Sequence, residues 1–221
     1  RQNKLRASQK SILLEQKLLR SQMNPHFIFN SLIAIESYIY DNDPATAGAY
    51  LSKFAQLMRQ TLENSAEEYI TLEKEILALQ NYLTLQQLRF ENTFNFTIHV
   101  DDAIDTSQIH IPPMLTQPFI ENAIEHGFKK NHGTGQIQIN FKLKDNCLLG
   151  EVIDNGIGIY QNQKPQEIKP IHKSMALSIT TERLQLLNKG ASKKISLNIQ
   201  ELNKEGAVTG TGVYFSIPLL R

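Results

Sequence analysis

The sequence predicts an α+β fold in which a helical N-terminal half precedes a half that mixes strands with helices. Residues 1–66 are rich in helix-forming residues and contain one glycine, Gly48. From residue 94 onward, apolar residues recur at every second position, which is typical of strands with one buried face. Helical patterns at about 115–127 and 177–189 interrupt these strands. Together these observations indicate a helical segment followed by a sheet that carries helices on one face.

The first segment has a heptad spacing. Leu5, Ile12 and Leu19 recur every seven residues, as in a short coiled coil. The same spacing continues to His26, which directly follows Pro25. Proline removes a backbone donor from a helix and crowds the preceding turn, so we expect a kink at this point.

The residues after the proline predict a helix with a narrow apolar stripe. At about 100° per residue its members fall on one side of the helix, and we expect this side to be the main packing face. His26 falls nearly opposite the stripe, so its side chain is expected to point away from that face. The stripe consists of Ile28, Leu32, Ile35 and Ile39.

The second helix of a hairpin is expected at Asp43-Pro44, an N-cap residue followed by proline at the first helical position. Two such amphipathic helices form a hairpin, and hairpins from two chains would form a four-helix bundle. The apolar side of this second helix contains Leu51, Phe54, Met58 and Leu62.

A third helix is expected after Thr71, whose hydroxyl is suited to cap it. Glu73 and Glu75 would lie in its first turn, where negative charge is favourable. Its inward side would contain Leu72, Ile76, Leu79 and Leu83. Beyond it, alternating apolar residues predict strands at 94–100, 137–143, 147–153, 195–199 and 213–217.

The composition excludes several classes of protein. Of the 221 residues, 41% are hydrophobic and 20% are charged, as in an ordinary soluble globular protein. The 23 Lys and Arg residues nearly balance 22 Asp and Glu residues without a long block of one sign, which argues against nucleic-acid binding. The single cysteine, Cys147, excludes an internal disulfide and is typical of a reducing compartment.

The segment PFIENAIEHG, at 118–127, predicts a helix with polar residues on one side. Asn122 and His126 would lie one turn apart on that side, and Gly127 is a natural residue to end the helix. An Asn carbonyl is a suitable hard ligand for Mg²⁺, which usually shares its coordination with substrate phosphates. By itself, however, the segment favours an ordinary surface helix. His126 either faces a nucleotide or ends the helix favourably as a cation.

Two glycine-containing segments follow strand patterns. In Asp154-Asn155-Gly156-Ile157-Gly158, the Asp154 carboxylate would accept a hydrogen bond from the exocyclic amine of adenine, and the glycines would let the backbone approach a ligand. The alternative is a turn that ends a strand. Likewise, Gly210-Thr211-Gly212 marks a ligand-binding segment or a bend in the last strand.

In order along the chain, these segments resemble the LytS-type sensor histidine kinases from about residue 20 to the end. The phosphoacceptor motif of that family is similar to QMNPHFIFNSL at 22–32, and its next signature to LEKE at 72–75 with Tyr82-Leu83 and Leu88-Arg89-Phe90. Its N box resembles QPFIENAIEHG at 117–127, preceded by Ile111-Pro112-Pro113-Met114. Its G1 box resembles Asp154–Gly158. The triplet Glu182-Arg183-Leu184 and the closing strand from Gly210 to Pro218 also match.

The resemblance implies a dimerising helical hairpin over residues 1–68 and a GHKL-type ATP-binding domain with a Bergerat α/β sandwich over 69–221. It implies that His26 accepts the γ-phosphoryl group of ATP and passes it to an aspartate of a response regulator. It further implies that Asn122 binds Mg²⁺, that Asp154 binds adenine with support from Thr211, and that Gly156 and Gly158 begin the ATP lid. The family also implies a cytoplasmic core in a protein anchored to the membrane.

No apolar run has the length needed to cross a bilayer, and no signal-peptide pattern opens the chain. The chain begins at Arg1 rather than at methionine, so we expect it to be a piece of a longer protein whose upstream segment provides the membrane attachment.

The lid departs from the family pattern, which has two glycines and an asparagine where this chain has Ser174, Ala176 and Ile179. Such glycines let backbone N–H groups curl round phosphates. Their replacement favours an alternative, a pseudokinase or dimeric signalling scaffold that binds ATP weakly. A third possibility, a GHKL ATPase, is disfavoured because Pro118 stands where ATP-hydrolysing relatives of the fold have a catalytic Glu.

Overall fold

The computed structural model describes residues 25–41, 43–91, 93–128, 134–158, 175–189, 191, 193–204 and 207–219. The expected coiled coil and the turn preceding the Pro25 kink lie outside these residues. Within the described ranges, no helix combines the length and apolar character that crossing a bilayer requires.

The expected hairpin is present. Its first helix, α2, spans Pro25–Tyr40, and the second, α3, spans Pro44–Ser65. Asp43 caps α3 as expected, because its carboxylate accepts a hydrogen bond from the backbone N–H of Thr46 at 3.0 Å. Pro44 follows at the first helical position, where it needs no hydrogen-bond partner.

The predicted packing face of the hairpin is only partly covered within the chain, and its burial in a dimer stays a prediction. In α2 the buried side chains are Phe27, Ser31 and Ile35, whereas Leu32 is 49% exposed and Ile39 is 62% exposed. In α3 the buried side chains are Ala47, Tyr50, Leu57, Thr61 and Asn64. The periodicity was helical in both cases, but each helix carries two stripes that can pack. The stripe rich in aromatic and small residues faces the rest of this chain.

The third helix confirms its prediction. It is α4, which spans Leu72–Arg89, and the Thr71 hydroxyl accepts from the N–H of Lys74 at 3.4 Å. Leu72, Leu79 and Leu83 are at most 2% exposed. Just before α4, strand β1 (Ile70–Thr71) pairs antiparallel with β3 (His110–Ile111).

All five predicted strands are present and form one sheet in the order β2-β4-β5-β7-β6. Strand β2 is parallel to β4, and the other pairs are antiparallel. Their bounds are β2 Phe94–Val100, β4 Gly135–Lys144, β5 Cys147–Asp154, β6 Ser196–Lys204 and β7 Ala207–Pro218. The remaining helices are α5 (Gln117–Asn122), a π-helical turn η1 (Ala123–Gly127) and α6 (Met175–Leu187).

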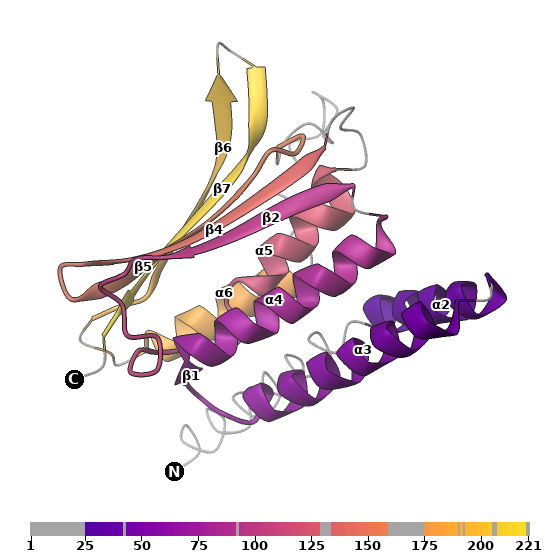
Figure 1. Ribbon diagram of the computed structural model, residues 1–221. Coiled ribbons are helices and arrows are strands. Elements are labelled where there is room, and N and C mark those ends of the chain that lie inside the picture. The colour runs from indigo at the N-terminus through magenta and orange to yellow at the C-terminus, as the bar shows by residue number, and fades with distance from the viewer. Residues whose placement is uncertain are drawn as a thin grey trace, which may run out of the picture.

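Figure 1 shows α4, α5 and α6 packed against one face of the sheet, with the α2–α3 hairpin against the far side of α4. This arrangement confirms the predicted α+β class with helices on a single face. The outward-facing residues of the central strands are polar or only half-buried, as expected for a sheet with one solvated face.

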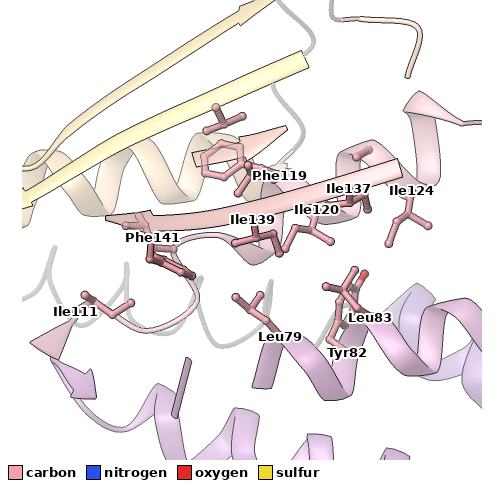
Figure 2. Close-up of a cluster of buried hydrophobic side chains, with 14 of the residues drawn as sticks. Leu79, Tyr82, Leu83, Ile111, Phe119, Ile120, Ile124, Ile137, Ile139 and Phe141 are labelled. Atoms are coloured by element: carbon pink, nitrogen blue, oxygen red, sulfur yellow. The ribbon is translucent and has the colours of Figure 1, made fainter. Parts of the chain in front are cut away.

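The core that positions the site lies between α4, α5 and the sheet (Figure 2). The inward side chains of β4, Ile137, Ile139 and Phe141, are at most 1% exposed. They meet Leu79 and Leu83 of α4 on one side. The helices α5 and η1 contribute Phe119, Ile120 and Ile124. Each such burial stabilises the fold by about 1.5–3 kcal/mol, so α5 is held firmly on the sheet.

Candidate nucleotide-binding site

Three segments that lie far apart in the sequence meet at the end of β5. Asp154, the last residue of β5, pairs in register with Thr211 of β7. A Cβ built on Gly127, at the end of η1, would lie 3.7 Å from Asp154 Oδ1 and 4.0 Å from the backbone carbonyl oxygen of Asn122. The sheet register and the packing of α5 therefore bring together the three segments that the sequence analysis singled out.

Asp154 is the buried charged group of this site. It is 8% exposed and accepts a hydrogen bond from the N–H of Gly156 at 2.8 Å. Thr211 of β7 lies opposite Asp154 in the ladder. Burial raises the pKa of the Asp154 carboxyl, and hydrogen bonding by Gly156 and Thr211 opposes the rise. A carboxylate offers about four acceptor positions, so this group retains capacity for an amine of a ligand such as adenine.

Gly156 is required for a contact within the protein. A Cβ at this position would lie 2.8 Å from the Cα of Gly127 and 2.9 Å from Asp154 Oδ1. The Ile157 N–H then donates to the Gly127 carbonyl at 3.1 Å. Sequence reasoning had assigned this glycine to the approach of a ligand. In the structure it allows the loop after β5 to pack directly on the turn that ends the N-box segment.

Two further glycines of the site have left-handed backbone conformations. Gly158 has φ 80° and Gly210 has φ 147°. A Cβ on Gly210 would also overlap the backbone carbonyl of Asp154. Gly210 therefore lets β7 lie unusually close to the backbone of Asp154, and the β6–β7 register shifts between Leu202 and Asn203, opposite this part of β7.

The N-box segment ends differently from the expectation. Residues 123–127 form a π-helical turn, in which the Phe128 N–H donates to the Ala123 carbonyl five residues earlier at 3.1 Å. Gly127 is the last residue of this wide turn rather than a left-handed residue after the helix. The predicted one-turn pairing of Asn122 with His126 assumed an α-helical turn. Single π-helical turns often occur at functional sites.

Asn122 is the last residue of α5 and its side chain is half-buried. Its amide oxygen is a hard ligand of the kind that suits Mg²⁺ shared with phosphates. Among the described residues, no three His, Cys, Asp or Glu side chains gather as a metal site.

Several predicted site residues lie outside what the structure describes. The backbone of His26 is in the first turn of α2, but the orientation of its side chain, and that of His126, is outside the described residues. The same holds for Ser174 and for the side chains of Ala176 and Ile179, whose backbone belongs to α6. Predictions about the lid and the direction of His26 stay predictions.

Sequence reasoning missed the structural role of Asn155. Its side chain accepts from the Gln136 N–H at 2.7 Å and donates to the Thr134 carbonyl at 3.1 Å. Its own N–H donates to the Gln136 carbonyl at 3.2 Å. Asn155 therefore ties the loop after β5 to the start of β4. Asn in a turn often forms such bonds, but its partner depends on strand order, which the sequence does not display.

Comparison with known proteins identifies relatives of the chain. Residues 14–94 match the family model described as histidine kinase. The chain is 34% identical over 218 residues to the sensor protein LytS of Oceanobacillus iheyensis, over 95% of this chain and 35% of that protein. It is 31% identical over 208 residues to the sensor histidine kinase YpdA of Escherichia coli, over 92% of this chain and 34% of that protein.

The chain therefore spans about a third of the length of these relatives. Among solved structures it is similar to the histidine kinase domain of a blue-light activated histidine kinase from Erythrobacter litoralis, with 18% identity and a TM-score of 0.48, over 97% of this chain and 94% of that chain. On the evidence of the matched family model and of relatives that align along nearly the whole sequence, the chain belongs to the LytS-type sensor histidine kinases.

Proposed function

We propose that this chain is the catalytic core of a two-component sensor histidine kinase that phosphorylates itself on His26 from Mg-ATP. Residues 1–68 are the dimerisation and phosphoacceptor segment, and residues 69–221 are the ATP-binding domain. The phosphoryl group then passes to an aspartate on the receiver domain of a response regulator. No nucleic acid takes part in these steps.

The observation that supports this proposal most is that three segments distant in sequence meet at Asp154. A carboxylate that is 8% exposed lies beside Gly127, the last residue of the N-box segment, and pairs in register with Thr211 of β7. A buried acceptor of this kind suits the amine of adenine, because a buried carboxylate without a full set of donors is costly. Asn122 is then on the side toward the phosphates and holds Mg²⁺ with its amide oxygen.

The chemical step needs few protein groups. A neutral imidazole nitrogen of His26 attacks the γ-phosphorus of ATP, an N–P bond forms, and the bond to the β–γ bridging oxygen breaks, so ADP leaves. Imidazole is largely neutral near pH 7 and needs no strong base. Most of the catalysis in phosphoryl transfer comes from positioning of the reactants and from neutralisation of phosphate charge. Mg²⁺, when bound, would contribute to the charge neutralisation.

The hairpin supports the proposed dimer. Its large apolar side chains with an exposed fraction of 49% or more are Phe29, Leu32, Ile33, Ile39, Tyr40, Leu51 and Leu62. They are spaced as one stripe along α2 and one along α3, on helix sides that are exposed in the described part of the chain. A second copy of the hairpin covers both stripes by forming a four-helix bundle. The full-length protein is anchored at the cytoplasmic face of the membrane through an upstream segment.

Labelling with γ-³²P-ATP and Mg²⁺ tests the proposal. Acid-labile, alkali-stable label is expected on the chain and is expected to disappear in His26→Gln and Asn122→Ala. His99→Gln is the matched control, because His99 is exposed on β2 at the solvent face of the sheet. Nucleotide binding without label would contradict autophosphorylation and favour the signalling scaffold, which the replaced lid residues Ser174 and Ala176 suggest. Steady phosphate release would favour an ATPase.

A further inference from the structure

Glu75 is a buried carboxylate away from the nucleotide site. It lies in the first turn of α4 and is 1% exposed, although its neighbour Glu73 is exposed. Both residues were predicted to lie at a helix start, where acidic side chains are usually solvated. Position 75 falls on the same helix side as Leu79 and Tyr82, however, and this phase turns its carboxylate toward the core. A buried charge must be matched by hydrogen bonds or opposite charge.

The partners of Glu75 all belong to the loop that leads into α5. The Met114 N–H donates to Glu75 Oε2 at 2.9 Å, and the Thr116 hydroxyl donates to Oε1 at 3.0 Å. The Thr116 backbone N–H also favours the ionised form of Glu75 and so lowers its pKa. Met114 has φ 55°, a left-handed conformation that costs a residue with a side chain of order 1 kcal/mol. The two hydrogen bonds to Glu75 hold the loop in this conformation.

Thr116 occupies the N-cap position of α5, yet its hydroxyl does not cap the helix. The hydroxyl is turned toward Glu75 instead. The Thr116 carbonyl nevertheless accepts the first helical hydrogen bonds, from Phe119 at 3.1 Å and Ile120 at 3.4 Å. The place where α5 begins therefore depends on a side chain of another helix, and Asn122 lies at the other end of α5.

Arg183 contacts the same loop from another helix. It lies in α6, which follows the segment where the family resemblance places the ATP lid, and its Nη1 donates to the Pro113 carbonyl at 2.6 Å. Its positive charge also favours the ionised form of Glu75, although burial is the larger effect and raises the pKa of that carboxyl. Residues 113–116 are thus fixed by α4 through Glu75 and by α6 through Arg183.

We infer that Glu75 and Arg183 are positioning residues that hold the 113–116 loop and thereby place Asn122 for Mg²⁺. This inference rests on the proposed function, in which Asn122 is the Mg²⁺ ligand. Neither residue touches the nucleotide. Their effect is confined to the part of ATP affinity that depends on Mg²⁺, since Asp154 holds adenine from β5 and is independent of the loop.

The test measures ATP affinity of the 221-residue chain in Mg²⁺ and in EDTA. In Glu75→Gln, the gain in affinity from Mg²⁺ is expected to fall about tenfold, because a displacement near 1 Å at a catalytic group has effects of this order or larger. Affinity in EDTA is expected to stay at the wild-type value. Glu73→Gln is the matched control, since it removes the same charge from the same helical turn and is expected to change neither value.

Two variants of Thr116 test the inference independently, in case Glu75→Gln does not fold. Thr116→Val removes one donor to Glu75 with little change of shape and is expected to reduce the Mg²⁺-dependent gain. Thr116→Ser keeps the hydroxyl and is expected to retain the wild-type Mg²⁺-dependent gain in ATP affinity. If Thr116→Val and Thr116→Ser both reduce the Mg²⁺-dependent gain, the role of Thr116 is purely structural and the inference is overturned. The same conclusion follows if a variant lowers ATP affinity equally in Mg²⁺ and in EDTA.

A double-mutant cycle separates this inference from the proposed function. If Glu75 acts through Asn122, Glu75→Gln adds no further loss of the Mg²⁺-dependent gain in an Asn122→Ala background. Additive losses would overturn the inference alone. If Asn122→Ala itself leaves the Mg²⁺-dependent gain unchanged, the assignment of Mg²⁺ to Asn122 fails, and the inference fails with it.

Discussion

The ring of Phe27, the residue after His26, packs on the ring of Tyr82 in α4 with centroids 5.4 Å apart. The ring of Phe54 in α3 also packs on Phe27, with centroids 6.0 Å apart. Burial raises the pKa of the Tyr82 hydroxyl, and the carboxylates of Glu121 and Glu125 in the N-box segment add to the rise. Tyr82 of α4 thus packs against α2 and is also influenced by the charge of the N-box segment.

Truncation of Phe27 is expected to loosen the hairpin from α4. Phe27→Ala removes a side chain that is 7% exposed, and such a change in a core costs about 3–5 kcal/mol. The free energy of unfolding, measured by urea denaturation, should fall by that order. Phe29→Ala is the matched control, because Phe29 is 64% exposed on the same helix. Equal effects of the two changes would contradict the packing described here.

Asp154→Asn is expected to weaken ATP binding by about 1.5–3 kcal/mol, the range for hydrogen bonds to charged groups. The amide would present an N–H₂ group where the carboxylate accepts hydrogen bonds. Competition between ATP and GTP for a fluorescent nucleotide should show a loss of preference for adenine. Glu151→Gln removes a charge from the same strand on the opposite face of the sheet and should leave this preference intact.

The buried carboxyls predict a distinct dependence of stability on pH. Burial raises the pKa of both Glu75 and Asp154 above their ordinary values of 4.5 and 3.8. The folded chain therefore binds protons more readily than the unfolded chain at these two groups. Their contribution to the free energy of unfolding is fully present below the unfolded pKa and is lost as pH rises through the folded pKa.

Glu75→Gln should remove part of this slope. Urea unfolding between about pH 4 and 7 is expected to show a smaller decline of stability with rising pH in the variant than in the wild type. Asp105 provides a control of opposite sign, because hydrogen bonds from Ser107 lower its pKa and its contribution is lost as pH falls. An unchanged slope in Glu75→Gln would contradict the assigned burial of this carboxyl.

The exposed stripe on α3 predicts that a charge there prevents dimerisation. Leu51 is 50% exposed, and Leu51→Glu would place a carboxylate inside the proposed four-helix bundle. Light scattering at micromolar concentration should give a dimer for the wild type and a monomer for this variant. Gln56→Glu introduces the same charge on an exposed position of α3 away from the stripe and should remain dimeric. A monomeric wild type would contradict the bundle.

Much of the local structure followed from short-range patterns. The two-residue period of β2 and β4, the Asp43 and Thr71 caps and the inward side of α4 all depend on neighbours within a few residues. Such features are decided by side-chain phase and by local hydrogen bonds. The motif residues Asp154, Gly156 and Thr211 were also singled out by sequence, and their order along the chain predicted a common site.

By itself, then, the sequence determined the class of the long helices and of the five strands of the main sheet, and it singled out the segments that meet at the end of β5. Only the tertiary structure decided which apolar stripe of α2 is covered, that Glu75 is buried, and that Gly156 packs against Gly127. Each of these depends on which residues distant in sequence become neighbours. Periodicity describes one element at a time, whereas burial and close backbone contact are properties of two elements packed together.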